Sequence, residues 1–211
     1  MKNLLKLLII AGTCHSLVIE AKVPETTLIN QTNTPALLDG HCGSDEWEAA
    51  TKIEHPASAT VYVMHDDQYF YICAKGNEGE LTVLDLYIQN TETEKLHKFH
   101  LSAQMGEAIF EDNDWKNVGT WQLKDWAGFW VPYFGTRDTD NGKAPKFYSD
   151  AHRQVQIARR KFPGNTWKMM FTVSIRRDGN WLNILFPEKA KDNDETTWNT
   201  FSFSENNEHA K

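Results

Sequence analysis

The chain has little positive charge and few cysteines. Its 211 residues include 22 Lys and Arg against 29 Asp and Glu, which gives a net charge of −7. A protein that binds nucleic acid or an anionic membrane surface through its charge needs the opposite balance. We therefore expect neither of these as a partner.

The sequence also lacks the common catalytic signatures. It has no Gly-x-Ser-x-Gly elbow, no His-Glu-x-x-His pair and no glycine-rich phosphate loop. Each of these motifs places a nucleophile, a metal or a phosphate in a defined local geometry. Their absence favours a binding protein over an enzyme.

Long hydrophobic runs are absent after the first residues. Met1–Lys6 carries two lysines, and the apolar stretch Leu4–Gly12 is followed by small residues. This order is typical of a secretory signal peptide, and the stretch is too short to span a bilayer. We predict a signal peptide over 1–21, a protein exported to the periplasm or beyond, and no membrane span.

The remaining chain divides by composition. Residues 22–36 are polar and rich in Thr and Asn, which predicts a flexible leader. The ordered domain is expected over 37–204, followed by a frayed polar tail at 205–211.

Two cysteines remain after the signal peptide is removed. Cys42 and Cys73 can form a disulfide in an exported chain, or they can be two buried free thiols. Their spacing does not suggest a metal site.

Short strand-like segments dominate the domain, and helical periodicity is never sustained for ten residues. Thr60–Met64 and Tyr69–Lys75 flank a polar turn and predict a hairpin, and Gln154–Lys161 with Trp167–Ile175 predicts a second one. Many short strands with regular turns predict an all-β protein, an antiparallel β-sandwich.

The stretch from 111 to 150 has no clean period and is rich in aromatic residues. We interpret it as one long, packed loop excursion between strands. Asp138, Asp140, Asn141 and Gly142 within it are similar to a calcium loop, but the spacing is one residue short of the EF-hand pattern and no Glu follows at the closing position, so no calcium ligands are assigned.

The order of the segments resembles family 9 carbohydrate-binding modules. LLDGHCGSDEWEAATKIE resembles their opening, ATVYVMHDDQYFYICAKG their hairpin, TVLDLYIQN their next strand, and KFHLSAQMGE, WKMMFTVSIRR, WLNILF and ETTW their later strands. The resemblance covers about residues 37–203. It implies a jelly-roll-like sandwich of the DOMON-like superfamily, a mono- or oligosaccharide ligand and, in this family, calcium.

The resemblance also implies a set of site residues. Trp198 corresponds to one aromatic wall of the sugar slot and Asn183 to a nearby amide, while Asp85 stands where the family has Glu and His100 where it often has Arg. The second wall is missing, because Gly76–Glu80 has no aromatic residue. Trp126 and Trp130 are the candidates to supply it.

Two tryptophans at strand starts, Trp167 and Trp181, are interpreted as structural. An aromatic ring covers the apolar face of a pyranose, and planar polar side chains bind its hydroxyl rim.

Two other functions stay open. Some segments, such as VQIARRKFPGNTWKMMF, also resemble haem-binding subunits of the same superfamily, in which Met105 with Lys168 or Lys189 would be the axial ligands. The third possibility is a structural or partner-binding sandwich of the cell envelope.

Overall fold

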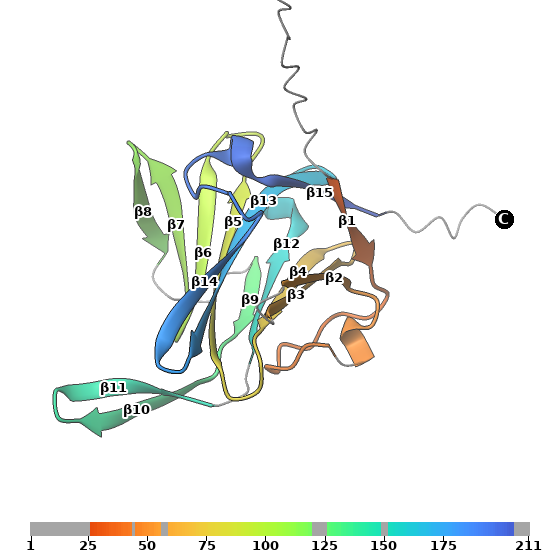
Figure 1. Cartoon of the computed structure of the whole chain (residues 1–211). Helices are drawn as coiled ribbons and strands as arrows, with labels where there is room; N and C mark the ends of the chain where they lie inside the picture. The colour runs from red at the N-terminus through yellow and green to blue at the C-terminus, as the bar shows by residue number, and fades with distance from the viewer. Residues whose placement is uncertain (1–25, 44, 56–58, 120–125, 149–151, 205–211) are drawn as a thin grey trace, which may run out of the picture.

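The computed structural model describes residues 26–43, 45–55, 59–119, 126–148 and 152–204 (Figure 1). The expected signal peptide and polar tail lie outside these ranges. Among the described residues there is no α-helix, and no helix is long and apolar enough to cross a membrane.

The described part of the chain is built from β-strands. These are β1 Thr26–Gln31, β2 Thr51–His55, β3 Ala59–His65, β4 Tyr69–Lys75, β5 Leu81–Gln89, β6 Leu96–Leu101, β7 Met105–Glu111, β8 Asp114–Gly119, β9 Ala127–Trp130, β10 Tyr133–Thr139, β11 Gly142–Phe147, β12 Arg153–Ala158, β13 Thr166–Arg177, β14 Asn180–Phe186 and β15 Asn199–Phe203. Three short 3-10 turns connect them, η1 Asp45–Trp47, η2 Arg159–Lys161 and η3 Glu195–Thr197.

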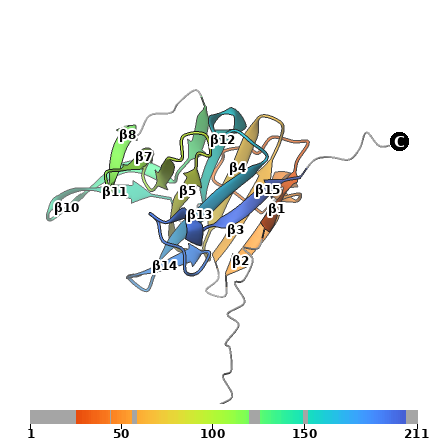
Figure 2. The same ribbon diagram turned by 90° about the horizontal axis from the view of Figure 1, so that it is seen from above.

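The strands form two packed layers, confirming the predicted all-β sandwich (Figures 1 and 2). Sheet A has the order β8-β7-β6-β5-β13-β15, with β14 also paired to β13, and sheet B has the order β3-β4-β12-β9, with β2 paired to β3. Strand β1 joins the layers, because it pairs in parallel with both β15 and β3. The predicted antiparallel pairing holds for the other named strand pairs of the described residues, and the two parallel pairs of β1 make the sandwich mixed.

The core lies between the inner faces of the two sheets. Alternate residues of each strand point inward, as the two-residue period of a strand requires. Leu84, Leu86 and Ile88 of β5 meet Val155 and Ile157 of β12 in this core. The opposite set of alternate residues is thereby directed to the outer faces.

The expected leader at 22–36 is wrong where the structure describes it. Thr26–Gln31 forms β1, and the Ile29 side chain is fully buried between the sheets. The segment looks polar because Ile29 is the one buried residue among the six of this strand. A composition average hides one inward apolar residue among Thr and Asn.

The second expected hairpin is also wrong. β12 pairs with β4 and β9 in sheet B, while β13 pairs with β5, β14 and β15 in sheet A. The turn at Pro163–Gly164 therefore carries the chain from one layer to the other. Two strands joined by a turn have the same sequence pattern whether they pair with each other or lie in different sheets.

The aromatic stretch at 111–150 is only partly loop. It contributes β8 to sheet A, β9 to sheet B and a separate two-stranded ribbon of β10 and β11 that projects from the sandwich (Figure 1). Its remaining segments include residues outside the described ranges.

Cys42 and Cys73 are joined in a disulfide that closes a sequence separation of 31 residues. The bridge ties the loop before η1 to the central strand β4. Both half-cystines are buried beside Trp47 and Tyr62 on the outer side of sheet B.

We expect the Cys42→Ser and Cys73→Ser double variant to lose about 3–4 kcal/mol of unfolding free energy, since the bridge restricts a loop of this length in the unfolded chain. Urea denaturation with and without a reductant measures this. Equal stability of the oxidised wild type and the double variant would contradict it.

Candidate functional site

One row of side chains crosses the outer face of sheet A. The strand register places His100 opposite Asp85, Asp85 opposite Thr172, and Thr172 opposite Leu185. Directly opposite residues of antiparallel strands have Cβ atoms about 4.5–5.5 Å apart on the same face. Gly106 follows His100 on β7, so no side chain closes that end of the row.

The acidic residue of this row, Asp85, is paired with the basic residue, His100. The His100 Nδ1 lies 2.6 Å from the Asp85 Oδ1, with the Asp85 side chain 16% exposed and that of His100 37% exposed. Both were expected in the site because of the family resemblance, and the fold does place them in contact. The pair presents a ring nitrogen and a carboxylate oxygen at the surface.

The next rows add an amide, a hydroxyl and an indole. Ser174 lies opposite Asn183 and its Oγ donates a hydrogen bond of 2.7 Å to the Asn183 Oδ1. Trp181 lies two residues before Asn183 on β14, which puts it on the same face, and 54% of it is exposed. Arg176 lies opposite Trp181.

We call this surface the Trp181 face; it consists of His100, Asp85, Thr172, Ser174, Asn183 and Trp181. It joins three expected residues to three that the sequence analysis missed. Trp181 was interpreted as structural because it starts a strand. The signal that could have found it is its spacing, since positions 181 and 183 share one face in any strand.

Trp198 does not form part of this surface. Its side chain is 2% exposed and packs in a small cluster with Tyr87, Leu96, Met170 and Ala190. Its Nε1 donates a hydrogen bond of 2.7 Å to the Lys191 carbonyl oxygen. The expectation that Trp198 is a wall of a sugar slot is therefore wrong, because both ring faces are covered.

The cover over Trp198 comes from neighbouring aromatic residues. The Tyr87 ring lies 6.1 Å from the Trp198 ring, and Trp115 of β8 lies 5.5 Å from Tyr87. Trp115 donates from its Nε1 to Asp192 at 3.3 Å. The β7–β8 hairpin and the loop before β15 thus cover the Trp198 ring, so that a sugar cannot stack on it.

Trp126 and Trp130 do not supply a second wall beside Trp198 either. Trp126 packs against Phe99 on the inner side of β6, opposite to His100, and the Lys161 Nζ lies 3.7 Å from its ring. The Trp130 ring lies against the Gly40 backbone, where an added Cβ would come within 2.5 Å of it. Both indoles belong to other surfaces.

The residues named for the haem alternative are separated. Met105 is buried in the core between the sheets, whereas Lys168 alternates with inward Trp167 and Met169 and lies on the outer side of β13. The two side chains therefore lie on opposite faces of sheet A and cannot bind one iron from both sides. Lys189 is exposed in the loop after β14.

The calcium-like segment forms the tip of the β10–β11 ribbon, where Asp138 pairs with Lys143. Within the described ranges, the one group of three or more His, Cys, Asp or Glu donors close enough to share a metal is Cys42, Cys73 and His152. Two of those three sulfur and nitrogen donors are already engaged in the disulfide.

A buried cluster of charged residues lies on the inner face of sheet A, whereas the Trp181 face lies on its outer face. Glu107 accepts from the His97 Nδ1 at 2.9 Å and pairs with the Lys161 Nζ at 3.0 Å. Burial by itself raises the pKa of Glu107, but these two hydrogen bonds outweigh it and hold the pKa below its usual range. The Glu107 carboxylate is therefore held by two buried partners on the inner side of sheet A.

His152 is held neutral beside the disulfide. Its Nδ1 accepts a hydrogen bond of 2.8 Å from the Cys42 backbone N–H. Burial, with a smaller contribution from the charge of Lys75, lowers the pKa of His152 to about 4.

The fold and the Trp181 face define a β-sandwich with a polar, partly aromatic surface on one sheet. No protein-family model matches the sequence, and no curated protein matches it. Among solved structures, a protein from Bacteroides uniformis, described as a "putative carbohydrate-binding protein", aligns with 86% of this chain and 100% of its own at a TM-score of 0.52 and 10% identity.

Two structures of a family 9 carbohydrate-binding module from Caldicellulosiruptor kristjanssonii are also similar. The complex with cellotriose has a TM-score of 0.49 at 11% identity and covers 89% of this chain and 97% of that one. The complex with glucose has a TM-score of 0.47 at 10% identity, covering 85% and 96%. The similarity to the Bacteroides uniformis structure agrees with the expected sandwich fold.

Truncating the two indoles should have different effects on stability. We expect Trp198→Ala to cost about 3–5 kcal/mol, because a buried ring leaves a cavity, and Trp181→Ala to change stability by less than about 0.5 kcal/mol. Urea denaturation of both variants measures this. Similar losses would contradict the assigned positions of the two rings.

Acid should destabilise the protein through His152. Its pKa is about 6.5 when unfolded and about 4 when folded, so the unfolded chain binds more protons between these values and stability falls as pH decreases through that window. We expect His152→Gln, which keeps an acceptor for Cys42, to weaken this dependence. Thermal melting from pH 7 to pH 4 provides the measurement.

Proposed function

We propose that the protein is an exported, non-catalytic carbohydrate-binding protein and that the sugar binds to the Trp181 face. The observation that carries the proposal is the exposed Trp181 indole beside a continuous set of hydrogen-bonding side chains on four adjacent strands. The fold supports this function, because a similar structure from Bacteroides uniformis is described as a "putative carbohydrate-binding protein".

The chemistry of a pyranose explains how such a surface would bind it. The apolar C–H face of the sugar would stack on the Trp181 ring, and its hydroxyl groups would meet both donors and acceptors. Asn183 and Ser174 supply an amide and a hydroxyl, and the Asp85–His100 pair supplies a carboxylate and an imidazole. The proposed site therefore differs from the slot implied by the family resemblance, because the sugar would stack on Trp181 and not on Trp198.

The geometry also suits an open surface better than a closed slot. A single exposed indole covers one face of a sugar and leaves the other in water, so the affinity per ring is modest. Weak, reversible contacts with several rings of a longer chain would suit an extended face that crosses four strands. We therefore expect oligosaccharides to bind more tightly than monosaccharides.

Calorimetry of the mature chain with glucose, cellotriose and other neutral oligosaccharides tests the proposal. We expect Trp181→Ala to weaken binding at least about tenfold, since losing a stacked aromatic anchor costs about 2 kcal/mol. Asn183→Ala should weaken binding less. Leu182→Ala is the matched control, because Leu182 is an exposed residue of the same strand that points to the opposite face.

Two results would overturn the assignment. The first is the absence of any sugar-dependent heat across the panel. The second is binding that survives Trp181→Ala and Asn183→Ala but is lost in Leu182→Ala, which would move the ligand to another surface.

A further inference from the structure

A second concave region lies on the outer side of sheet B, away from the Trp181 face. It consists of two cavities of about 490 and 550 Å³ that share Thr32 and Asn33, the residues that follow β1. Small-molecule sites commonly have volumes of about 300–1,000 Å³. We call the two cavities together the Tyr69 groove.

The first cavity combines aromatic rings with amides. Tyr69 and Tyr71 of β4 line it, with ring centroids 6.2 Å apart. Amide side chains surround the rings from three separate segments: Gln31 of β1, Gln68 of the β3–β4 turn and Gln156 of β12. An aromatic surface bordered by planar amides is the combination that recognises a ring with hydroxyl groups at its edge.

The carboxylate in this cavity is already occupied by the protein. Asp66 accepts from the backbone N–H groups of Gln68 and Tyr69 at 2.7 and 2.6 Å, and its other oxygen accepts from the Tyr71 hydroxyl at 2.6 Å. Burial, assisted by this hydrogen bond, raises the pKa of Tyr71. Asp66 therefore shapes the turn and orients Tyr71, and it has few lone pairs left for a cation.

Other polar groups of the cavity remain available to a ligand. Among the described residues, the side-chain amide of Gln156 and the hydroxyl group of Tyr69 form no hydrogen bond, and both side chains are partly exposed. An amide offers a donor and an acceptor in one plane, and a phenol offers one of each. Both can bind a sugar hydroxyl in either direction.

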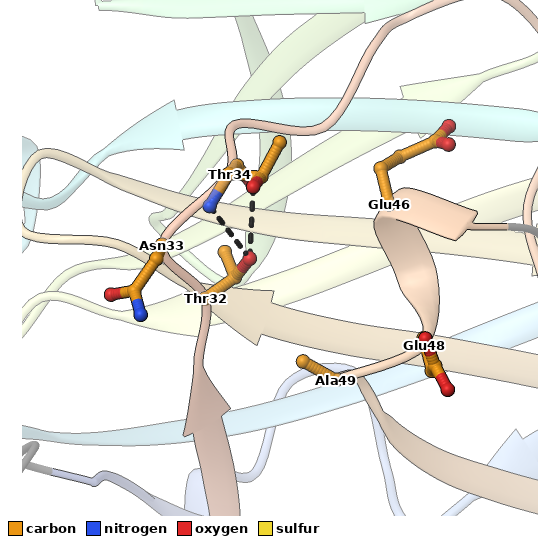
Figure 3. Close-up of a pocket in the computed structure, with 6 residues that line it drawn as sticks. All are labelled: Thr32, Asn33, Thr34, Glu46, Glu48 and Ala49. Carbon is orange, nitrogen blue, oxygen red and sulfur yellow. Dashed lines mark hydrogen bonds between the residues drawn. The ribbon is translucent and has the colours of Figure 1, made fainter.

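The second cavity extends the groove toward η1. Figure 3 shows Thr32–Thr34 on one side of this cavity and Glu46, Glu48 and Ala49 on the other, with Thr32 and Thr34 held together by hydrogen bonds. Among the residues that the structure describes, the lining of the two cavities contains no Lys, Arg or His. An anionic ligand would thus meet several carboxylates, while the nearby Arg159 guanidinium donates to the Asp66 carbonyl oxygen at 3.2 Å from outside the lining. The excess of negative charge in the lining disfavours such a ligand.

We propose that the Tyr69 groove is a second carbohydrate site, which binds an uncharged oligosaccharide independently of the Trp181 face. One sugar ring rests on Tyr69 and bonds to Gln156, and the chain continues past Thr32 into the cavity lined by Glu46 and Glu48. Two sites on opposite sheets of one domain would let the protein bridge two glycan chains or bind a surface with higher avidity.

Chemical-shift mapping by amide NMR on the mature chain tests the inference. The probes are four neutral trisaccharides: cellotriose, xylotriose, mannotriose and maltotriose. We expect at least one to shift the amide signals of Thr32, Gln68, Tyr69 and Gln156 in a saturable manner. Tyr69→Ala and Gln156→Ala should each weaken the affinity measured from these signals at least about fivefold.

Matched controls separate this site from the first. Tyr133→Ala removes an exposed tyrosine of β10 outside both sites and should leave all affinities unchanged. Trp181→Ala should abolish shifts around Asn183 and leave those around Tyr69 intact. Gln156→Ala changes a partly exposed side chain, so it stays informative if Tyr69→Ala does not fold.

The outcomes are distinct. Saturable shifts at the groove that Gln156→Ala weakens support the second site, whether or not the Trp181 face responds. Shifts confined to the Trp181 face, or no shifts with any of the four sugars, overturn it. Shifts confined to the groove would overturn the Trp181 face as the site while leaving the second site standing.

Discussion

The structure depends on burying one face of each sheet in a shared core. Every second side chain of β5, β12 and β13 is committed to that core, which includes Leu86, Ile157 and Phe171. The residues between them therefore point to the outer faces of the sheets. The outer position of Asp85 is thus a consequence of Leu84 and Leu86 pointing inward.

The same constraint explains why two tryptophans of similar sequence context have different roles. Trp198 and Trp181 both lie toward the outer side of sheet A. The β7–β8 hairpin and the loop before β15 fold over Trp198 and make a second small core, whereas no segment within the described ranges covers Trp181 in this way. Some of the many aromatic residues therefore pack in the cores and others lie on the surface, so their number does not indicate a single ligand slot.

Most individual strands could be predicted from the sequence, because alternation of apolar and polar residues is a local property. The segment TVLDLYIQN, which resembles a strand of the family, lies in β5 apart from its last residue, and the hairpin of β3 and β4 is confirmed. The pairing of Gln154–Lys161 with Trp167–Ile175 could not be predicted, since partner choice depends on contacts between distant segments. The strand at Thr26–Gln31 was missed for the same reason: only the two sheets that it joins explain its burial.

The candidate site divides in a similar way. The sequence by itself determined the two-residue period, and with it that Trp181 and Asn183 share a face, as do Asp85 and Tyr87. Only the tertiary structure decided that β6, β5, β13 and β14 lie side by side, so that Asp85, His100 and Asn183 gather on one surface, and that Trp198 is enclosed. The physical reason is that side-chain direction follows from the local backbone, whereas adjacency and cover arise from packing between segments far apart in the chain.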